Sequence, residues 1–432
     1  MKKVNFLILA LTAFIFFSCS KDDKANDPFI QGQETHSAVS LSFPKTMLKS
    51  ADEGAANTVE AEVTTVAVYI VDDINGMMHK GVFNNTQFVE QNGKYALTSA
   101  IKTTTGDKKI YVVLNPGATL QTNIDNMKGG IFGDIALDGT AANYVTASDL
   151  VMASTAAASK TLTVQTEAEA LADPLAITVQ RNTAKVAVKE KSASTPVIGG
   201  SIANLEFAML VEAKKSYLVQ QGGNTLGTVI TPGRNISPLT ADNDYFTKLS
   251  TPSTWKSVNT NSVENKDLAG YYVLENVNVS NVTGNTTAAI IKGQYTPTAN
   301  TVVVAYAANG TRTIGSISAG ESFYVKKSDN TFWSESAYAD ALNNGLTAGH
   351  FSKKYDNGTG YYRIWVQDAD GNRGVLRNNY YVLNVTKISG PGLPSVPGVD
   401  PEDPNLPIEE DTYISVEVTI LPWNVESSDH EL

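Results

Sequence analysis

The sequence predicts an all-β protein of two tandem β-sandwich domains, followed by a proline-rich tether and a terminal strand. Charged residues make up only 18% of the 432 residues, and threonine, valine, alanine, asparagine and glycine are abundant, which is typical of sandwiches. Short strand candidates separated by turn residues recur along the chain. They are 63–71, 109–114, 162–164, 177–180, 184–189, 205–211, 271–274, 288–292, 302–306, 323–326, 361–366 and 380–385. Only two short helices are indicated, at 167–172 and 335–342.

The amino terminus has the composition of a bacterial export signal. Two lysines precede an apolar run over residues 6–17, which is too short to span a bilayer and matches the core of a secretory signal. Ser18 and Cys19 follow, and a small residue before a cysteine at this point is typical of a lipoprotein signal, although Phe16 and Phe17 depart from the usual motif. We therefore expect removal of residues 1–18 and lipidation of Cys19. The alternative is a plain secretory signal with an incidental cysteine.

A short strand precedes the first domain. Val39, Leu41 and Phe43 alternate with serines, so one face of the extended chain is apolar. Pro44 ends the run, and a polar stretch over residues 45–54 follows, with the composition at which proteases cut. Cleavage there would remove the strand and leave an open apolar groove that requires a replacement strand. Residues 19–49 are thus predicted to be a pro-segment that is removed on maturation.

The length after the signal, about 410 residues, suits two or three domains. The segment 191–200 is rich in serine and glycine and contains Pro196, which makes it the best candidate for a domain boundary. The sequence therefore predicts an amino-terminal sandwich over residues 50–192 and a second sandwich over residues 193–389.

The carboxyl terminus combines a tether with a strand. Residues 390–412 contain six prolines and six acidic residues, a composition that we expect to form extended chain without a core. Such chain spans up to roughly 65 Å. Residues 413–432 then alternate apolar and polar side chains, with a change of phase at Leu421 and Pro422 that a bulge or bend would reconcile. The apolar positions are Ile414, Val416, Val418, Ile420, Trp423 and Val425. This strand either closes the sheet of its own domain or pairs with another molecule, and the long tether favours the second alternative.

Charge and motifs exclude several functions. The net charge of −11 argues against nucleic acid and anionic lipid as partners. No glycine-rich phosphate loop, catalytic pair of acids or metal-ligand cluster is present, so the sequence predicts a non-enzymatic protein with no catalytic residue, cofactor or metal site. The four histidines lie far apart and are expected at the surface. Residues 368–372 are similar to a calcium loop, but Arg373 and Asn379 stand where glycine and glutamate are required, which favours a turn.

The chain resembles the major fimbrial subunits, or fimbrillins, of Bacteroidetes, and is most similar to the short-fimbria (Mfa-type) shaft subunit of Porphyromonas. The resemblance rests on the lipoprotein signal, on the acidic residues that follow it, and on segments that recur in a shared order. These are VAVYIV (66–71), KIYVVLNP (109–116), RNTAKVAV (181–188), YVLEN (272–276), YYRIWV (361–366), RNNYYV (377–382) and the terminal ISVEVTILPWNV. The resemblance implies transthyretin-like sandwiches, lipoprotein export, cleavage of the first strand by a trypsin-like protease and polymerisation by strand exchange.

One departure from the family concerns the cleavage site. The family usually matures at an arginine, but the first arginine here is Arg181, inside the first domain. Cleavage must therefore use a lysine, with Lys49 preferred and Lys45 second, so that the mature chain begins at Ser50. The implied partners are further copies in a head-to-tail filament, accessory and anchor subunits, and a lysine-specific protease. The implied location is a cell-surface fimbria that supports adhesion, with a precursor held transiently in the outer membrane by lipid.

Two alternatives remain open. The chain could be a monomeric surface lipoprotein that binds glycans through aromatic residues, or a minor or tip component of a fimbria. The aromatic candidates are Trp333, Tyr361, Tyr362 and Trp365. Aromatic residues that alternate along strands usually fill cores, which weakens the glycan-binding interpretation.

Overall fold

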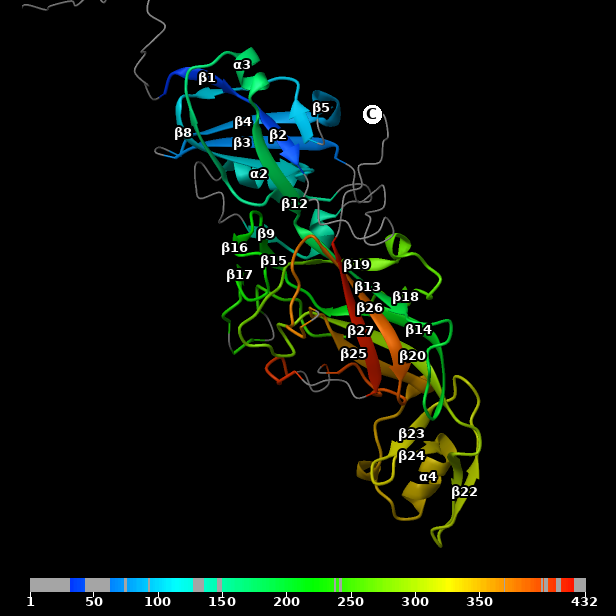
Figure 1. Cartoon of the computed structure of the whole chain (residues 1–432). Helices are drawn as coiled ribbons and strands as arrows, with labels where there is room; N and C mark the ends of the chain where they lie inside the picture. The colour runs from blue at the N-terminus through cyan, green and yellow to red at the C-terminus, as the bar shows by residue number, and fades with distance from the viewer. Residues whose placement is uncertain are drawn as a thin grey trace, which may run out of the picture.

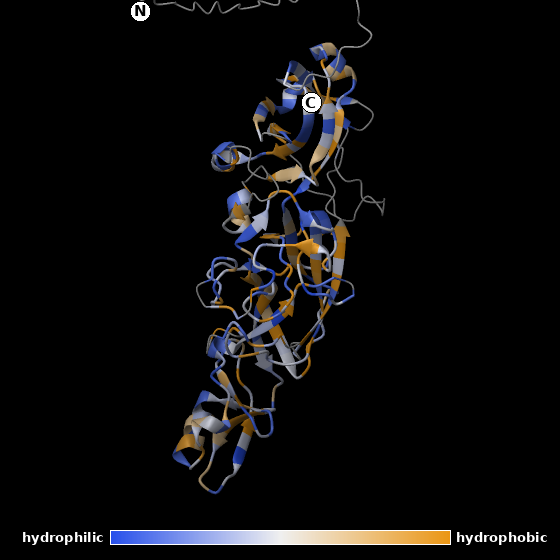
Figure 2. Cartoon of the chain, turned by 90° about the vertical axis from the view of Figure 1, so that its left-hand side faces the viewer, coloured by the Kyte–Doolittle hydropathy of each residue, from blue (hydrophilic) through white to orange (hydrophobic). Residues whose placement is uncertain are grey.

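The structure of the chain is a computed structural model that describes residues 32–42, 63–73, 76–91, 94–126, 136–145, 150–236, 238–240, 243–368, 370–397, 399, 403–408 and 413–422. The molecule is elongated, with a first domain at one end, a second domain in the middle and a small lobe at the other end (Figure 1). Hydrophobic colours follow many of its strands and hydrophilic colours many of its loops (Figure 2). The all-β sandwich architecture predicted from the sequence is confirmed.

The first domain is a folded sheet whose strand order is β4-β3-β8-β10-β12-β2-β6-β5, with β11 beside β8 and a separate β1-β7 pair. The strand β12 joins two halves, because residues 175–178 pair with β2 whereas residues 179–181 pair with β10. The strands are β1 (Glu34–Ser37), β2 (Val39–Ser42), β3 (Thr65–Asp72), β4 (Met78–Asn84), β5 (Phe88–Gln91), β6 (Lys94–Leu97), β7 (Ile101–Thr104), β8 (Gly106–Leu114), β9 (Ala136–Asp138), β10 (Met152–Ser154), β11 (Ala158–Leu162) and β12 (Leu175–Arg181).

Side-chain alternation along β3 explains the layers of the first domain. Val66, Val68 and Ile70 point into the core that also contains Val39 and Leu41. The intervening residues point to the opposite face, where the helix α2 (Gly117–Asn126) packs through Leu120 and Ile124. The second helix, α3 (Glu167–Ala172), begins with a capping box between Thr166 and Glu169.

The second domain contains two four-stranded sheets, β19-β13-β26-β27 and β18-β14-β20-β25, with a shared hydrophobic core that draws on both. Parallel pairing of β13 with β26 lies at the centre of the first sheet. The strands are β13 (Thr183–Glu190), β14 (Gly200–Val211), β15 (Lys215–Tyr217), β16 (Gln221–Gly222), β17 (Val229–Ile230), β18 (Lys256–Ser257), β19 (Gly270–Leu274), β20 (Ala288–Pro297), β25 (Thr359–Trp365), β26 (Asn379–Ile388) and β27 (Ile414–Pro422).

The lobe is an insertion between the paired strands β20 and β25. Its sheet has the order β22-β21-β24-β23, and the helix α4 (Glu335–Asn343) packs on it through Ala337 and Ala341 against Trp333. The strands are β21 (Val302–Tyr306), β22 (Arg312–Gly315), β23 (Phe323–Lys326) and β24 (Thr331–Ser334). The sequence predicts β21, β23 and α4 but not β22 or β24, and it places all of them in the second sandwich, because the composition of the insertion does not differ from that of the surrounding domain.

A buried junction links the two domains. The chain passes from β12 to β13 through Asn182, which is 0% exposed, and β9 of the first domain pairs with β15 of the second. Arg377 donates two hydrogen bonds to the Glu275 carboxylate at 3.1 and 3.2 Å, and both side chains are 1% exposed. Arg377 also donates hydrogen bonds to the Ser216 hydroxyl and the Tyr217 carbonyl of β15, so this buried ion pair fixes the strand of the second domain that pairs with β9.

Two predictions about chain organisation are wrong. The strand Thr183–Glu190 was assigned to the first domain, but it pairs with β19 and β26, so the domain change occurs at Asn182 rather than near residue 192. The serine- and glycine-rich segment is instead a loop within the second domain. The first domain ends in the strand β12 and the second begins almost at once with the strand β13. No turn-rich linker separates them, so the local sequence does not indicate a domain boundary at this point.

The tether also differs from its prediction. Its described residues lie against the second domain: Val396 is 4% exposed, and Asn405 exchanges hydrogen bonds with the backbone of Leu239. Thr283 donates a hydrogen bond to the Asp403 carbonyl. The expectation of extended chain without a core is therefore wrong for these residues, because proline rings and a few aliphatic side chains pack well where no backbone N–H needs a sheet partner.

Candidate functional site

The strand β2 occupies the interior of the first sheet. It pairs in parallel with β12 and antiparallel with β6, so both of its backbone edges are engaged. Val39 is 0% exposed and Leu41 is 2% exposed, and both belong to the main core of the domain. Removal of this strand would uncover core side chains together with backbone groups of β12 and β6.

The strand β1 continues this segment in the amino-terminal direction. Thr35 donates a hydrogen bond to the Thr163 carbonyl at 2.7 Å and accepts one from the Gln165 backbone N–H at 3.0 Å. Thr35 and Ser37 are each 1% exposed. The sequence analysis missed β1, because its buried side chains are hydroxyls and produce no apolar alternation.

The strand β27 lies at the edge of the second domain's first sheet, where β26 is its one partner among the described strands. Within the single chain the terminal strand closes its own sheet, and its pairing with another molecule stays a prediction. Ile414 and Leu421 are buried, whereas Val416, Val418 and Ile420 are half-buried against the second core. The change of phase predicted at Leu421 places its side chain in the cluster that contains the first domain's core residues.

Polar side-chain contacts along β27 are few, and they include one exposed ion pair. Lys191 forms an ion pair with Glu417 at 3.0 Å, and the two side chains are 50% and 56% exposed. Asn384 of β26 donates to the Glu417 carbonyl and the Thr419 hydroxyl. The attachment of β27 therefore depends mainly on one ladder of backbone hydrogen bonds and on half-buried aliphatic side chains.

The structure does not bring the two terminal strands together within one chain, since β2 lies in the first domain and β27 in the second. Several residues singled out from the sequence fall outside the described residues. These are Cys19, Phe43, Lys45, Lys49, Ser50, Trp423 and Val425. The described strands on either side of the predicted cleavage sites are β2, which ends at Ser42, and β3, which begins at Thr65.

The aromatic residues proposed for glycan stacking do not form an exposed platform. Trp333 and Tyr362 are 0% exposed and Trp365 is 4% exposed, while Tyr361 is half-buried. They fill hydrophobic cores of the lobe and the second domain. That interpretation is therefore wrong for these side chains.

Residues considered for metal binding or catalysis are dispersed. His36 and His79 are half-buried and His350 is exposed, so the expectation of surface histidines holds fully only for the last of these. Asp368 accepts hydrogen bonds from the backbone N–H groups of Asp370 and Asn372, which closes a turn. Among the described residues, no group of three or more His, Cys, Asp or Glu side chains could hold a metal ion. No helix of this part of the chain has the length and apolarity needed to cross a membrane.

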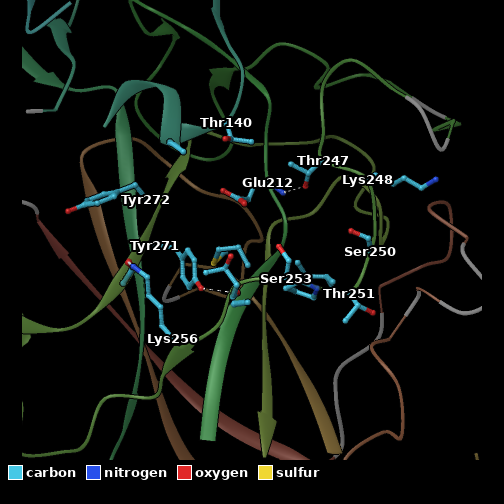
Figure 3. A pocket seen from close by; sticks show the side chains of 17 residues that line it. Thr140, Glu212, Thr247, Lys248, Ser250, Thr251, Ser253, Lys256, Tyr271 and Tyr272 are labelled. Atoms are coloured by element: carbon cyan, nitrogen blue, oxygen red, sulfur yellow. Dashed lines mark hydrogen bonds between the residues drawn. The ribbon is translucent and has the colours of Figure 1, made fainter. Parts of the chain in front are cut away.

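A cavity of about 480 Å³ with a mixed polar and apolar lining lies where the second domain meets residues 140–142 of the first (Figure 3). Glu212 follows β14 and lies at the wall, where burial raises the pKa of its carboxyl to about 7. Its backbone N–H donates a hydrogen bond to the Thr247 hydroxyl at 3.0 Å. The sequence analysis did not single out this residue, because a lone glutamate after a strand has no motif.

Comparisons with known proteins bear on these terminal strands. Residues 353–429, which include β27, match the family model described as "Major fimbrial subunit protein type IV, Fimbrillin, C-terminal". Two Porphyromonas gingivalis proteins named minor fimbrium subunit Mfa1 are each 23% identical to the chain over 508 residues, covering 99% of the chain and 99% of each relative.

Solved structures share the fold. The crystal structure of a fimbrilin (FimA) from Porphyromonas gingivalis W83 superposes with a TM-score of 0.50 at 16% identity, covering 91% of this chain and 99% of that chain. A structure described as a putative cell adhesion protein from Parabacteroides distasonis gives the same TM-score and identity, covering 91% of this chain and 100% of that one.

Proposed function

The resemblance to a Bacteroidetes fimbrial subunit of the Mfa type is confirmed, and from this premise we propose that the chain is a shaft subunit of a cell-surface fimbria that polymerises by strand exchange. The subunit is exported as a lipoprotein through Cys19 and cleaved after Lys49. Cleavage releases β1 and β2. The β27 strand of a neighbouring copy then enters the vacated groove, which produces a head-to-tail filament.

The observation that carries this proposal is the difference in sheet position between the two strands. The strand β2 has partners on both sides, so its loss leaves two unpaired backbone edges and an exposed core. The strand β27 has one partner, so its departure leaves the remaining three-stranded sheet paired. Removal of an interior strand leaves a groove that can accept another strand. Detachment of an edge strand breaks only one ladder of backbone hydrogen bonds.

Burial supplies a driving force for the exchange. In their own domain Val416, Val418 and Ile420 are half-buried, whereas the residues of β2 that they would replace are 0–2% exposed. Full burial of an aliphatic side chain contributes roughly 1.5–3 kcal/mol relative to full exposure. Because Val39 and Leu41 are the two apolar residues of β2, moving two half-buried side chains into the groove contributes on the order of 1.5–3 kcal/mol, and backbone pairing with both β12 and β6 replaces the single ladder with β26.

The connection between β2 and β3 supports cleavage at Lys49 or Lys45. The sequence between these strands includes the polar stretch 45–54, which contains Lys45 and Lys49. Long polar connections are the preferred sites of proteolysis. Amino-terminal sequencing of assembled fibres should find Ser50 first, and retention of Cys19 in the fibre would contradict this part of the proposal.

The central test changes the donor face of β27. We expect Val416→Asp combined with Val418→Asp to give a folded, cleavable subunit that forms no fibres after lysine-specific proteolysis, because two carboxylates cannot enter an apolar groove. Ser415→Asp combined with Thr419→Asp adds the same charge to the other face of the strand and should still polymerise. Electron microscopy, and electrophoresis without boiling, distinguish heat-labile oligomers from monomer. Normal fibres from the Val416/Val418 variant would exclude β27 as the donor.

A further inference from the structure

The cavity at the junction of the two domains, whose lining is partly polar and partly apolar, lies apart from the strand-exchange elements. None of its lining residues belongs to β1, β2 or β27, and all of them lie after the predicted cleavage site. Its volume of about 480 Å³ falls within the range of about 300–1,000 Å³ that small-molecule sites occupy. Its chemistry can therefore be considered separately from assembly.

Glu212 is the acceptor that the cavity offers to a ligand. Within the described part of the chain, no side chain or backbone N–H forms a hydrogen bond or ion pair with its carboxylate, in contrast to Glu275, which Arg377 holds. Figure 3 shows the Glu212 side chain at the wall, above the ring of Tyr271. A partly buried carboxylate without an internal partner is stabilised by hydrogen-bond donors that a ligand supplies.

The cavity carries charges of both signs. Lys256 donates a hydrogen bond to the Gly270 carbonyl, and its ammonium group lies 4.5 Å from the centre of the Tyr271 ring. Lys248 also belongs to the lining. An anionic ligand would meet the Glu212 carboxylate, and a cationic ligand would meet the two lysines. A neutral ligand with several hydrogen-bonding groups avoids both penalties.

Hydroxyl groups supply most of the remaining wall. A hydroxyl donates one hydrogen bond and accepts others, so it matches a ligand that also carries hydroxyls. Tyr271 donates its own hydroxyl to the Thr254 carbonyl at 3.1 Å, which fixes its ring at the side of the cavity. The hydroxyl side chains of the lining include Thr140, Thr247, Ser250, Thr251 and Ser253.

We propose that this cavity binds a neutral saccharide unit, with the Glu212 carboxylate accepting hydrogen bonds from sugar hydroxyls and the surrounding serine and threonine hydroxyls completing the contacts. A sugar ring has a face of C–H groups and an edge of hydroxyls, which suits a wall made of aromatic rings and hydroxyls. Such a site would let a surface-displayed subunit bind glycans without Trp333, Tyr361, Tyr362 or Trp365.

The test uses the uncleaved monomer, so that its result does not depend on fibre formation. The protein is applied to a printed array of neutral, amino and acidic glycans, and hits are confirmed with the free sugars by saturation-transfer NMR. We expect binding to neutral glycans, weakened at least tenfold by Glu212→Gln. Glu206→Gln is the matched control, since Glu206 lies on β14, pairs with Lys292 at 2.9 Å and does not line the cavity.

A second variant guards against a folding defect. Ser253 is exposed at the cavity, so Ser253→Trp should obstruct entry without disturbing the core. Loss of binding in both variants, with unchanged thermal unfolding, supports the site. Absence of binding across the array, unchanged binding in both variants, or a preference for amino or acidic sugars over neutral ones would each overturn the proposal.

Discussion

The two terminal segments of the chain both complete sheets, but they hold opposite positions within them. The strand β2 lies between β12 and β6 in the first domain, whereas β27 lies at the edge of the second domain beside β26 alone. Val39 is 0% exposed, and the central residues of β27 are half-buried. An interior strand leaves only if the chain is cut, while an edge strand can leave a folded domain. The comparison is the basis on which we propose acceptor and donor roles for the two segments.

The difference between the two strands is tested most strongly by placing one charge in each of them and comparing the stability of the two variants. We expect Val39→Asp to lower the free energy of unfolding of the uncleaved protein by more than about 4 kcal/mol, because the carboxylate is buried without a partner. Val418→Asp should cost no more than about 2 kcal/mol, since its site is half-buried. Urea denaturation of both variants measures the difference.

Cleavage provides the control for that experiment. After proteolysis at Lys49 the Val39→Asp substitution leaves with the pro-segment, so the trimmed variant and the trimmed wild type should unfold alike. Equal stability of the two uncleaved variants would mean that β2 is not an interior strand in solution.

The junction between the two regions is the next test. Arg377 precedes β26, the strand that holds β27, and its partner Glu275 is 1% exposed. We expect Arg377→Met to reduce the free energy of unfolding by about 3–5 kcal/mol, because it leaves a buried carboxylate unpaired. Lys102→Met is the control, since its ion pair with Glu34 is about three-quarters exposed and should contribute less than about 1 kcal/mol. Comparable losses in the two variants would contradict the role given to the junction.

The stability of the second domain, which contains Glu212, should depend more strongly on pH than the stability of the first domain. The folded protein retains the proton on this carboxyl up to a pKa of about 7, whereas the usual value is 4.5. The folded state thus binds more protons between these values. This contribution to stability is complete below about pH 4.5 and is lost as the pH rises through 7.

The loss of this contribution over the whole pH range corresponds to roughly 3 kcal/mol. Hydrogen exchange measured at pH 5.5 and 7.5 should show faster opening of β14 at the higher pH in the wild type, and a weaker dependence in Glu212→Gln. The first-domain strand β3 serves as the internal reference. An unchanged pH dependence in Glu212→Gln would exclude this carboxyl as the cause.

The smallest expected effect concerns the exposed ion pair on β27. Lys191→Ala removes the contact with Glu417, which is worth about 0.2–1 kcal/mol in an exposed setting. Amide exchange along β27 should become up to about fivefold faster, with little change in β26. Lys327→Ala in the lobe is the matched control and should leave β27 unaffected. Slower exchange in the Lys191 variant would contradict the view that this pair helps to retain the strand.

Much of the local structure could be predicted from the sequence, because alternation and turn residues act over a few positions. The helix Glu167–Ala172 begins and ends where its capping box and Pro174 indicate, and the strand predicted at 380–385 forms the central part of β26. The helix Gly117–Asn126 was missed, since its threonines and asparagines are weak helix formers. The cavity around Glu212 could not be found either, because its wall combines segments that are distant along the chain.

The sequence by itself determined the all-β class, the apolar strands with clear alternation such as β3, β13 and β26, and the apolar face of each terminal strand, since these properties depend on neighbouring residues only. Tertiary structure alone decided that β2 has two partners and β27 has one, that β13 belongs to the second domain, and that residues 302–343 form a separate lobe. Strand pairing joins residues far apart in the chain, and its register depends on the whole core, so no local pattern specifies it.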